Sequence, residues 1–331
     1  MQPFTYVIAP SAEAVPAALA DSRTRILAGG TTIYDLMKLG LEAPATLLDI
    51  TAIPGLDGIQ VTEGQLVFGA LARMSDAAAH PEVLRRCPVL AESLNRAASQ
   101  QLRNMATLGG NLLQRTRCAY FRNGPDYPCN KRVPGSGCAA QEGLDRGHAL
   151  FGGSEACIAV YPGDWAVALV AMDAALDLLG PGGSRSLPVS SLHRLPGDAP
   201  ERETVLQPGE MIQRIRVPLG RLGEASTYHK IRDRESYAFA LVSAAVALDL
   251  DGGVVRQARI ALGGVATRPW RVPEAEAALI GRRMDAALAA EAGRLAFTGA
   301  QPGRHNGFKM ELGARTVADA LLIAASRSGM P

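Results

Sequence analysis

The sequence predicts an α+β protein of two domains, and three observations lead to this prediction. The length of 331 residues exceeds that of one domain, at about 150 residues per domain. Hydrophobic residues make up 47% of the chain and charged residues 20%, a composition that builds cores and excludes global disorder. Strand-like and helix-like segments alternate at first, and strands later precede helices, an order typical of α+β domains. We expect domains at residues 1–222 and 223–331.

Charge and hydropathy argue against nucleic-acid binding, a secretory signal peptide and a membrane span. Lys plus Arg is 34 and Asp plus Glu is 32, and a net charge of +2 argues against nucleic-acid binding, which needs a basic excess. The N-terminus lacks the basic and apolar regions of a secretory signal peptide. The most apolar stretch, Trp165–Leu179, contains two aspartates and is too short to span a bilayer. We expect this stretch to form a buried amphipathic helix.

The first domain begins with a small lobe, about residues 1–55, that is patterned as a β-α-β-α-β unit. Its expected strands and helices are, in order, 4–8, 11–20 with Ser11 as N-cap, 25–28, 32–39 and 46–50. The larger lobe, about 56–222, opens with a hairpin at 58–69 around Glu63-Gly64. Its remaining regular elements are expected at 75–84, 88–99 and 165–179 as helices and at 211–217 as a strand.

The second domain is expected to contain a three-stranded antiparallel sheet followed by helices. The strands are predicted at 228–232, 239–250 and 254–263, with Asp251-Gly252 as the hairpin turn. The helices are predicted at 273–280, 284–297 and 315–326. The sequence contains no internal repeat.

Two glycine pairs in the first domain have the pattern of a phosphate-binding site. In Ile26-Leu-Ala-Gly-Gly-Thr-Thr-Ile33, the glycines let backbone N–H groups converge on an oxyanion at the start of a helix. Taken alone, this loop is more simply an ordinary tight turn before a capped helix. A second loop, Thr107-Leu-Gly-Gly-Asn111, changes that weighing. Two such loops fit a ligand with two phosphates and a sugar better than two unrelated turns.

Common nucleotide-binding motifs do not account for these loops. The one G-x-G-x-x-A match, Gly135–Ala140, lies in an irregular segment and does not follow a predicted strand, so we reject a Rossmann fold. The sequence has no G-x-x-x-x-G-K-[ST] motif, which removes the best signal for ATP hydrolysis.

A cysteine-rich segment, residues 112–157, interrupts the regular pattern. Four of the five cysteines lie in it or at its end, with the spacing Cys118-x10-Cys129-x8-Cys138-x18-Cys157. Long irregular segments in compact domains are usually functional or disordered, and the cysteines favour function. Four thiolates suit an iron–sulfur cluster or zinc, although the close cysteine pairs of zinc modules are absent. Spacing alone leaves a cluster, zinc, two disulfides and free buried thiols open.

Local charge and the remaining candidate residues add little to this choice. The segment from residue 103 to residue 132 contains six Lys and Arg residues but only one aspartate. This surplus of positive charge favours thiolates, but it equally fits a solvated or partner-facing basic patch. Cys87 is expected in the core. For His148 a hydrogen bond within the loop is expected rather than a ligand role, and His193 is expected at the surface.

Three motifs together resemble a known family. They are Ala28-Gly-Gly-Thr31, Arg103-Asn-Met-Ala-Thr-Leu-Gly-Gly-Asn-Leu112 and Pro162-Gly-Asp164 before an alanine-rich helix. They resemble the FAD-binding subunit of molybdenum hydroxylases, the xanthine dehydrogenase and carbon monoxide dehydrogenase family, over nearly the whole chain. The resemblance implies a two-part FAD-binding domain of the PCMH type, similar to vanillyl-alcohol oxidase, followed by a CO dehydrogenase flavoprotein-like C-terminal domain.

The resemblance also implies which residues hold the cofactors. The cysteine-rich segment is similar to the medium subunit of bacterial aldehyde oxidoreductases, which carries an additional 4Fe–4S cluster that most family members lack. The implied cluster ligands are Cys118, Cys129, Cys138 and Cys157. The implied FAD contacts are Leu27, Ala28, Gly29, Gly30, Thr31, Thr32, Thr107, Gly110, Asn111, Asp164, Ile212 and Lys230. Lys230 would lie near the flavin ring, and no acid–base catalytic residue is implied in this chain.

The implied activity needs partners. A large molybdopterin-binding subunit would oxidise an aldehyde to its carboxylic acid, and a small subunit with 2Fe–2S clusters would pass the electrons to FAD and an external acceptor. The chain would reach the periplasm with a partner that carries a twin-arginine signal, or stay in the cytoplasm. The competing hypotheses are a free-standing flavin oxidoreductase and a non-enzymatic, zinc-binding structural subunit.

Overall fold

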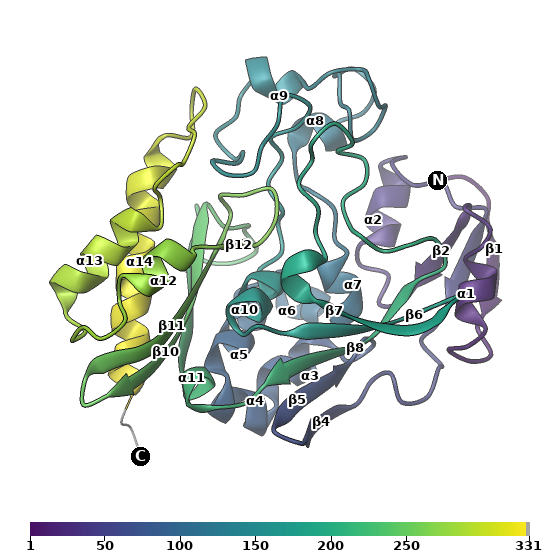
Figure 1. The fold of residues 1–331 in the computed structure, drawn as a ribbon. Helices are drawn as coiled ribbons and strands as arrows, with labels where there is room; N and C mark the ends of the chain where they lie inside the picture. Colours follow the sequence, from purple (N-terminus) through teal and green to yellow (C-terminus); the bar gives the residue numbers. More distant parts are fainter. Residues whose placement is uncertain (329–331) are drawn as a thin grey trace.

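The computed structural model describes residues 1–328, which form three β-sheets with helices packed against them (Figure 1). The N-terminal lobe contains a parallel sheet of order β1-β3-β2. Its elements are β1 (Thr5–Ile8), α1 (Val15–Ala18), β2 (Thr24–Leu27), α2 (Ile33–Lys38) and β3 (Thr46–Asp49). The predicted β-α-β-α-β order is therefore confirmed. The helix expected at 11–20 is shorter, and Ala14 rather than Ser11 is its N-cap, because Pro16 is tolerated only in a first helical turn.

The second sheet has five antiparallel strands in the order β4-β5-β8-β6-β7. Its strands are β4 (Ile59–Thr62), β5 (Gln65–Gly69), β6 (Ala175–Gly180), β7 (Gly183–Pro188) and β8 (Met211–Pro218). The predicted hairpin is confirmed, since Glu63 and Gly64 both have positive φ angles between β4 and β5. The helix expected over 165–179 is wrong beyond Ala171. Residues 175–180 instead pair with β7 and β8, which gives them the alternating burial of a strand.

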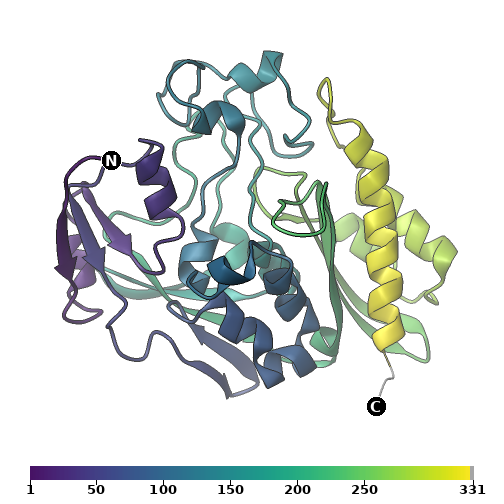
Figure 2. The ribbon, with the colours of Figure 1, turned by 180° about the vertical axis from the view of Figure 1, so that it is seen from behind.

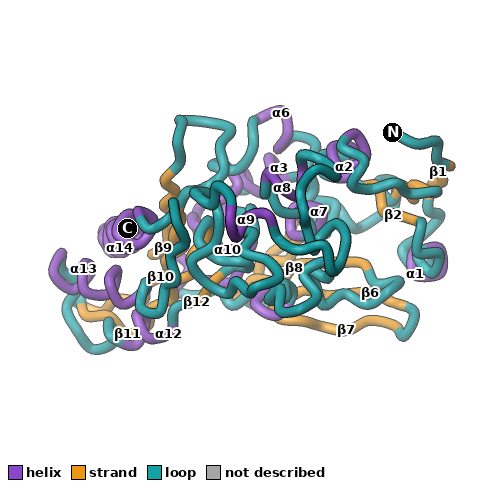
Figure 3. The backbone as a smooth tube through the Cα atoms, turned by 90° about the horizontal axis from the view of Figure 1, so that it is seen from above, coloured by secondary structure: helices purple, strands orange, loops and turns teal. Residues whose placement is uncertain are grey.

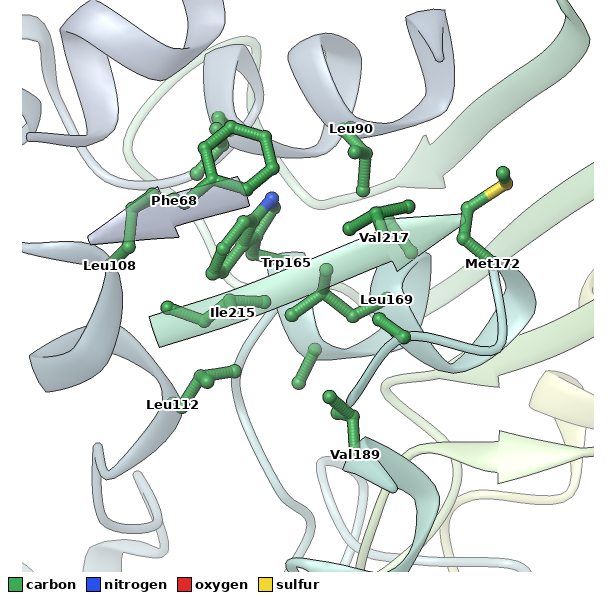
Figure 4. Packing of buried hydrophobic residues seen from close by; sticks show 14 of the residues in the cluster. Phe68, Leu90, Leu108, Leu112, Trp165, Leu169, Met172, Val189, Ile215 and Val217 are labelled. Carbon is green, nitrogen blue, oxygen red and sulfur yellow. The ribbon is translucent and has the colours of Figure 1, made fainter. Parts of the chain in front are cut away.

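Helices cover this second sheet and form the largest core. They are α3 (Met74–Ala79), α4 (Pro81–Arg86), α5 (Pro88–Asn95), α6 (Gln100–Arg103), α7 (Leu108–Leu112) and α10 (Trp165–Ala171). The helix expected at 75–84 is divided in two, because Pro81 cannot continue a helix interior. Figure 4 shows Trp165 of α10 against Phe68 of β5, with their ring centroids 5.8 Å apart in an edge-to-face arrangement. This core fixes α10 against the sheet, directly after Asp164.

The third sheet is antiparallel and has four strands, in the order β12-β11-β10-β9. The strands are β9 (Ala225–Ile231), β10 (Val242–Asp251), β11 (Val254–Gly263) and β12 (Trp270–Arg271). Helices α12 (Pro273–Ala277), α13 (Ala286–Leu295) and α14 (Phe308–Arg327) follow, with α14 along one face of the sheet (Figure 2). The predicted order of strands then helices is confirmed. The sheet gains the short edge strand β12, and α14 begins earlier than the expected residue 315.

The cysteine-rich segment projects from the body of the molecule. Its regular structure is limited to the single turns α8 (Ala119–Arg122) and α9 (Ala139–Glu142), and the view from above shows it mostly as loop (Figure 3). Two further short elements are α11 (Arg221–Glu224) and the 3-10 turn Val189–Ser191. Within residues 1–328, no helix combines the length and the apolar character needed to cross a membrane.

Candidate cofactor-binding sites

A cavity of about 910 Å³ lies where the N-terminal lobe, the helical layer and the third sheet meet. The N-terminal lobe lines it with the β2–α2 loop, and the helical layer lines it with the start of α7. Gly209–Ile212 at the start of β8, Lys230 of β9 and the β9–β10 loop complete the wall. Apolar walls with a few polar groups are typical of cofactor pockets, and this volume lies at the large end of their usual range.

The first glycine pair brings the two predicted loops into direct contact. A Cβ on Gly29 would overlap the carbonyl oxygen of Met105 and lie 2.8 Å from its carbonyl carbon. Gly30 has a φ of +73°, which side chains rarely adopt. Thr32 precedes α2, but its hydroxyl makes no capping hydrogen bond. The loop therefore exposes backbone to the cavity in a conformation that depends on both glycines.

The second loop is held equally close. Thr107 is the N-cap of α7 and its hydroxyl accepts a hydrogen bond from the Gly110 N–H, at 3.4 Å. A Cβ on Gly109 would lie 2.9 Å from the Cβ of Ala70, the residue that follows β5. The Oδ1 atom of Asn111 is buried without a hydrogen-bond donor among the described residues, although Asn111 lines the cavity. A buried acceptor without a partner fits a site whose ligand supplies the donor.

A buried ion pair between Asp164 and Lys230 forms part of the cavity wall. The Nζ atom of Lys230 lies 2.8 Å from Oδ2 of Asp164 and also donates to the carbonyl oxygen of Arg96 at 3.0 Å. The hydroxyl of Tyr228 donates to Oδ1 of Asp164 at 2.7 Å. Burial raises the pKa of Asp164, and the Lys230 ammonium opposes part of that rise. Asp164 and Lys230 thus hold each other at the cavity, joining α10 to β9.

The cavity gathers eleven of the twelve residues that the sequence singled out for FAD. These are Ala28, Gly29, Gly30, Thr31, Thr32, Thr107, Gly110, Asn111, Asp164, Ile212 and Lys230. Leu27 is not among the lining residues, and as the last residue of β2 it pairs with Asp49 of β3. Sequence reasoning missed Phe239, which it assigned to a strand. Phe239 lies in the β9–β10 loop at the cavity, with the Arg117 guanidinium 4.9 Å from its ring centroid.

The four clustered cysteines line a second, much smaller cavity. Cys129 and Cys138 pair through their backbones in an isolated antiparallel β-bridge. The Sγ atom of Cys118 lies 3.3 Å from Nε2 of His148, and the Ala159 N–H lies 3.4 Å from Sγ of Cys157. All the cysteines are free thiols rather than disulfides. Burial raises the pKa of Cys118 to about 11 and also raises that of Cys157.

The thiols do not converge on a single point. Among the described residues, no group of three or more His, Cys, Asp or Glu side chains is arranged to hold one metal ion. A single zinc ion needs its sulfur ligands about 2.3 Å from one centre, whereas a cubane cluster takes one thiolate at each of four separated corners. Four cysteine thiols are the usual donor set of a 4Fe–4S cluster, and all four line this cavity.

Four of the six basic side chains between residues 103 and 132 form ion pairs. These pairs, with nitrogen–oxygen distances of 2.5–3.3 Å, are Arg115–Glu203, Arg115–Glu42, Lys131–Glu203, Arg117–Asp35 and Arg122–Asp35. Asp35 and Glu42 come from the N-terminal lobe, so these pairs tie the cysteine-rich segment to the lobe that carries the first glycine loop.

Two residues that line neither of these two cavities complete the sequence predictions. Cys87 is fully buried in the main core, as expected, and burial raises its pKa to about 12. The surface position expected for His193 is wrong. Its ring packs on Tyr161, and Nε2 lies 2.9 Å from the carbonyl oxygen of Leu112. Burial of the ring lowers the pKa of His193 to about 4.

Comparisons with known proteins match the whole chain. A family described as the FAD binding domain in molybdopterin dehydrogenase matches residues 2–220, and the CO dehydrogenase flavoprotein C-terminal domain matches residues 226–324. The aldehyde oxidoreductase FAD-binding subunit PaoB of Escherichia coli (strain K12) is 46% identical over 331 residues, or 99% of this chain and 100% of the relative. The carbon monoxide dehydrogenase medium chain of Hydrogenophaga pseudoflava is 28% identical over 261 residues, or 79% and 74%.

Solved structures share the same architecture. Carbon monoxide dehydrogenase from Hydrogenophaga pseudoflava matches with a TM-score of 0.78 and 28% identity, over 99% of this chain and 100% of that one. Quinoline 2-oxidoreductase from Pseudomonas putida 86 matches with a TM-score of 0.76 and 25% identity, over 98% of both chains.

Proposed function

Because the chain belongs to the family of FAD-binding medium subunits of molybdenum hydroxylases, we propose that it is the electron-transfer subunit of a heterotrimeric aldehyde oxidoreductase. The observation that carries this proposal is the 46% identity, over the full length, to a relative named as an aldehyde oxidoreductase FAD-binding subunit. The partners would be a large molybdopterin-binding subunit and a small 2Fe–2S subunit. An external acceptor would take the electrons.

FAD would occupy the large cavity, with its pyrophosphate between the two glycine loops. The close approach of Gly29 to Met105 and the unpartnered acceptor of Asn111 support this placement. Ile212 would contact the adenine side, and Lys230 would lie toward the flavin ring. We assign this role to a domain of residues 1–222, with residues 223–331 closing the cavity through β9 and the β9–β10 loop.

Bound FAD supplies chemistry that links one-electron carriers to acceptors of one or two electrons. The chain's own part is to hold, orient and shield. The β9–β10 loop, with Phe239, lines one side of the cavity. Lys230 is already neutralised by Asp164, so the pair contributes a fixed dipole and a precise position rather than a free positive charge. No side chain here needs to move a proton for the oxidation of the aldehyde.

The cysteine-rich segment would carry a 4Fe–4S cluster on Cys118, Cys129, Cys138 and Cys157. Two observations support this part of the proposal: the four cysteines line one cavity, and none of them is in a disulfide. Ligation requires thiolates, so the cysteine thiols would release their protons when a cluster binds. Lys131 lines the same cavity, with its ammonium paired to Glu203.

The test is to co-express the chain with its two partner subunits and to measure flavin, iron, sulfide and zinc in the purified complex. The proposal expects one FAD in this subunit and four irons beyond those of the 2Fe–2S subunit. Cys129→Ser should remove the additional electron paramagnetic resonance signal but leave flavin bound. Cys87→Ala, a core cysteine, is the matched control and should keep both. One zinc without additional iron would reject the cluster, and an absence of flavin would reject the whole assignment.

A further inference from the structure

His148 lies directly behind one of the proposed cluster ligands. Its Nε2 atom is 3.3 Å from Sγ of Cys118, a normal length for a hydrogen bond that involves sulfur. The imidazole is 6% exposed, and it is not among the residues that line the four-cysteine cavity. His148 therefore contacts the Cys118 sulfur without itself lining the cavity between the four thiols. This position is that of a hydrogen-bond partner and not of a ligand.

The backbone at His148 is fixed by the C-terminal domain. Lys309, at the start of α14, is fully buried, and its Nζ atom donates to the carbonyl oxygens of His148 at 3.0 Å and Gly264 at 2.9 Å. The amide of His148 donates to the carbonyl oxygen of Asp145 at 2.8 Å. The Asp145 carboxylate in turn accepts from the Arg304 amide, also at 2.8 Å. The segment before α14 therefore holds this part of the cysteine-rich loop in place (Figure 2).

The chemistry of a bound thiolate decides the direction of the hydrogen bond. A sulfur that ligates iron has no proton and only accepts, so Nε2 must carry the hydrogen. The Nδ1 atom has no partner among the described residues, which leaves Nε2 as the ring's only hydrogen-bonded nitrogen. Hydrogen bonds to the sulfurs of an iron–sulfur cluster set its reduction potential, because they stabilise the extra negative charge of the reduced state.

We propose that His148 is a positioning residue that donates an N–H···S hydrogen bond to Cys118 and thereby raises the reduction potential of the 4Fe–4S cluster. This inference rests on the proposed function, since it needs a cluster on Cys118. It adds a role for a residue outside the ligand set. It also gives the C-terminal domain a part in setting that potential, through the Lys309 contact to the His148 carbonyl.

The experiment compares His148→Leu, which removes the donor, with His148→Gln, whose amide nitrogen can replace Nε2. Both variants are purified as the complete complex, and the midpoint potential of the cluster is measured by a redox titration followed by electron paramagnetic resonance. We expect a more negative midpoint for His148→Leu and a midpoint near the wild-type value for His148→Gln. Loss of cluster iron only in the leucine variant would also support a required donor.

Two results would overturn the inference. One is a wild-type midpoint in His148→Leu with the cluster present, and the other is an equal shift, or equal loss of iron, in both variants. Failure of the proposed function is distinguishable, because the wild-type complex itself would then contain no additional iron, whatever residue 148 is.

Discussion

Gly29→Ala tests whether the two glycine loops must touch in order to hold FAD. The added methyl group would overlap the carbonyl oxygen of Met105 and lie 3.1 Å from the Cα atom of Ala106. Both obstacles are backbone, so no side chain can rotate away to relieve them. The substitution must therefore separate the β2–α2 loop from the loop before α7.

The magnitude follows from the kind of contact. Inserting a methyl group into a closely packed position costs about 1–3 kcal/mol. In the free protein the loops can relax apart and avoid part of that cost, but a ligand that binds both loops must bring them back together. If the full cost falls on binding, a loss of about 1–3 kcal/mol corresponds to about 5- to 150-fold weaker FAD affinity, at 1.4 kcal/mol for each factor of ten.

The assay is a titration of the apoprotein with FAD, followed by the quenching of flavin fluorescence. Gly182→Ala is the matched control, because a Cβ there meets nothing within 4 Å and lies in the β6–β7 turn. It should bind FAD as tightly as the wild type. An affinity for Gly29→Ala within twofold of the wild type, in a folded protein, would refute the argument that contact between the loops is required.

Two further predictions concern buried charge. Lys230→Met leaves the Asp164 carboxylate buried without its ammonium, so we expect about 3–5 kcal/mol less stability in urea unfolding, partly restored by adding Asp164→Asn; a loss below about 1 kcal/mol would contradict the buried pair. His193 has a folded pKa of about 4 against an ordinary 6.5, so as the pH falls the unfolded chain binds a proton before the folded chain does. Lowering the pH from 6.5 to 4 should therefore reduce wild-type stability by up to about 1.4 kcal/mol per pH unit. His193→Gln keeps a donor for the Leu112 carbonyl and should lose this part of the slope; urea midpoints at pH 7 and pH 5 with equal drops in both proteins would contradict it.

Local patterns were sufficient to predict much of the fold. Glu63-Gly64 identified the first hairpin, whose two turn residues have positive φ angles. The hairpin expected at Asp251-Gly252 forms one residue later, because Asp251 pairs with Val254 and the positive φ angles fall on Gly252 and Gly253. The glycine pairs at residues 29 and 109 identified the loops that meet at the large cavity. These signals depend on a few neighbouring residues, and the tertiary structure did not override them.

Other features depend on contacts that no local pattern contains. Residues 165–179 are apolar enough for a helix, yet the chain turns at Asp173, with a φ of +50°, because β8 offers residues 175–179 a strand partner. The basic surplus between residues 103 and 132 is partly paired, by acidic residues such as Asp35 and Glu42 that lie far away in sequence. His193 is buried for the same reason, since its partner carbonyl belongs to Leu112.

The cysteines show what the sequence and the tertiary structure each contributed. The sequence by itself determined that four of the five cysteines share one irregular segment, and the glycine-loop motifs resembled those of a flavin subunit. Only the tertiary structure decided that these thiols share one cavity, that no disulfide joins them, and that His148, held by α14, lies against Cys118. The physical reason is that an irregular segment has no periodicity from which a shape can be calculated. Its shape is set by the distant groups, such as Asp35, Glu203 and Lys309, that pair with it.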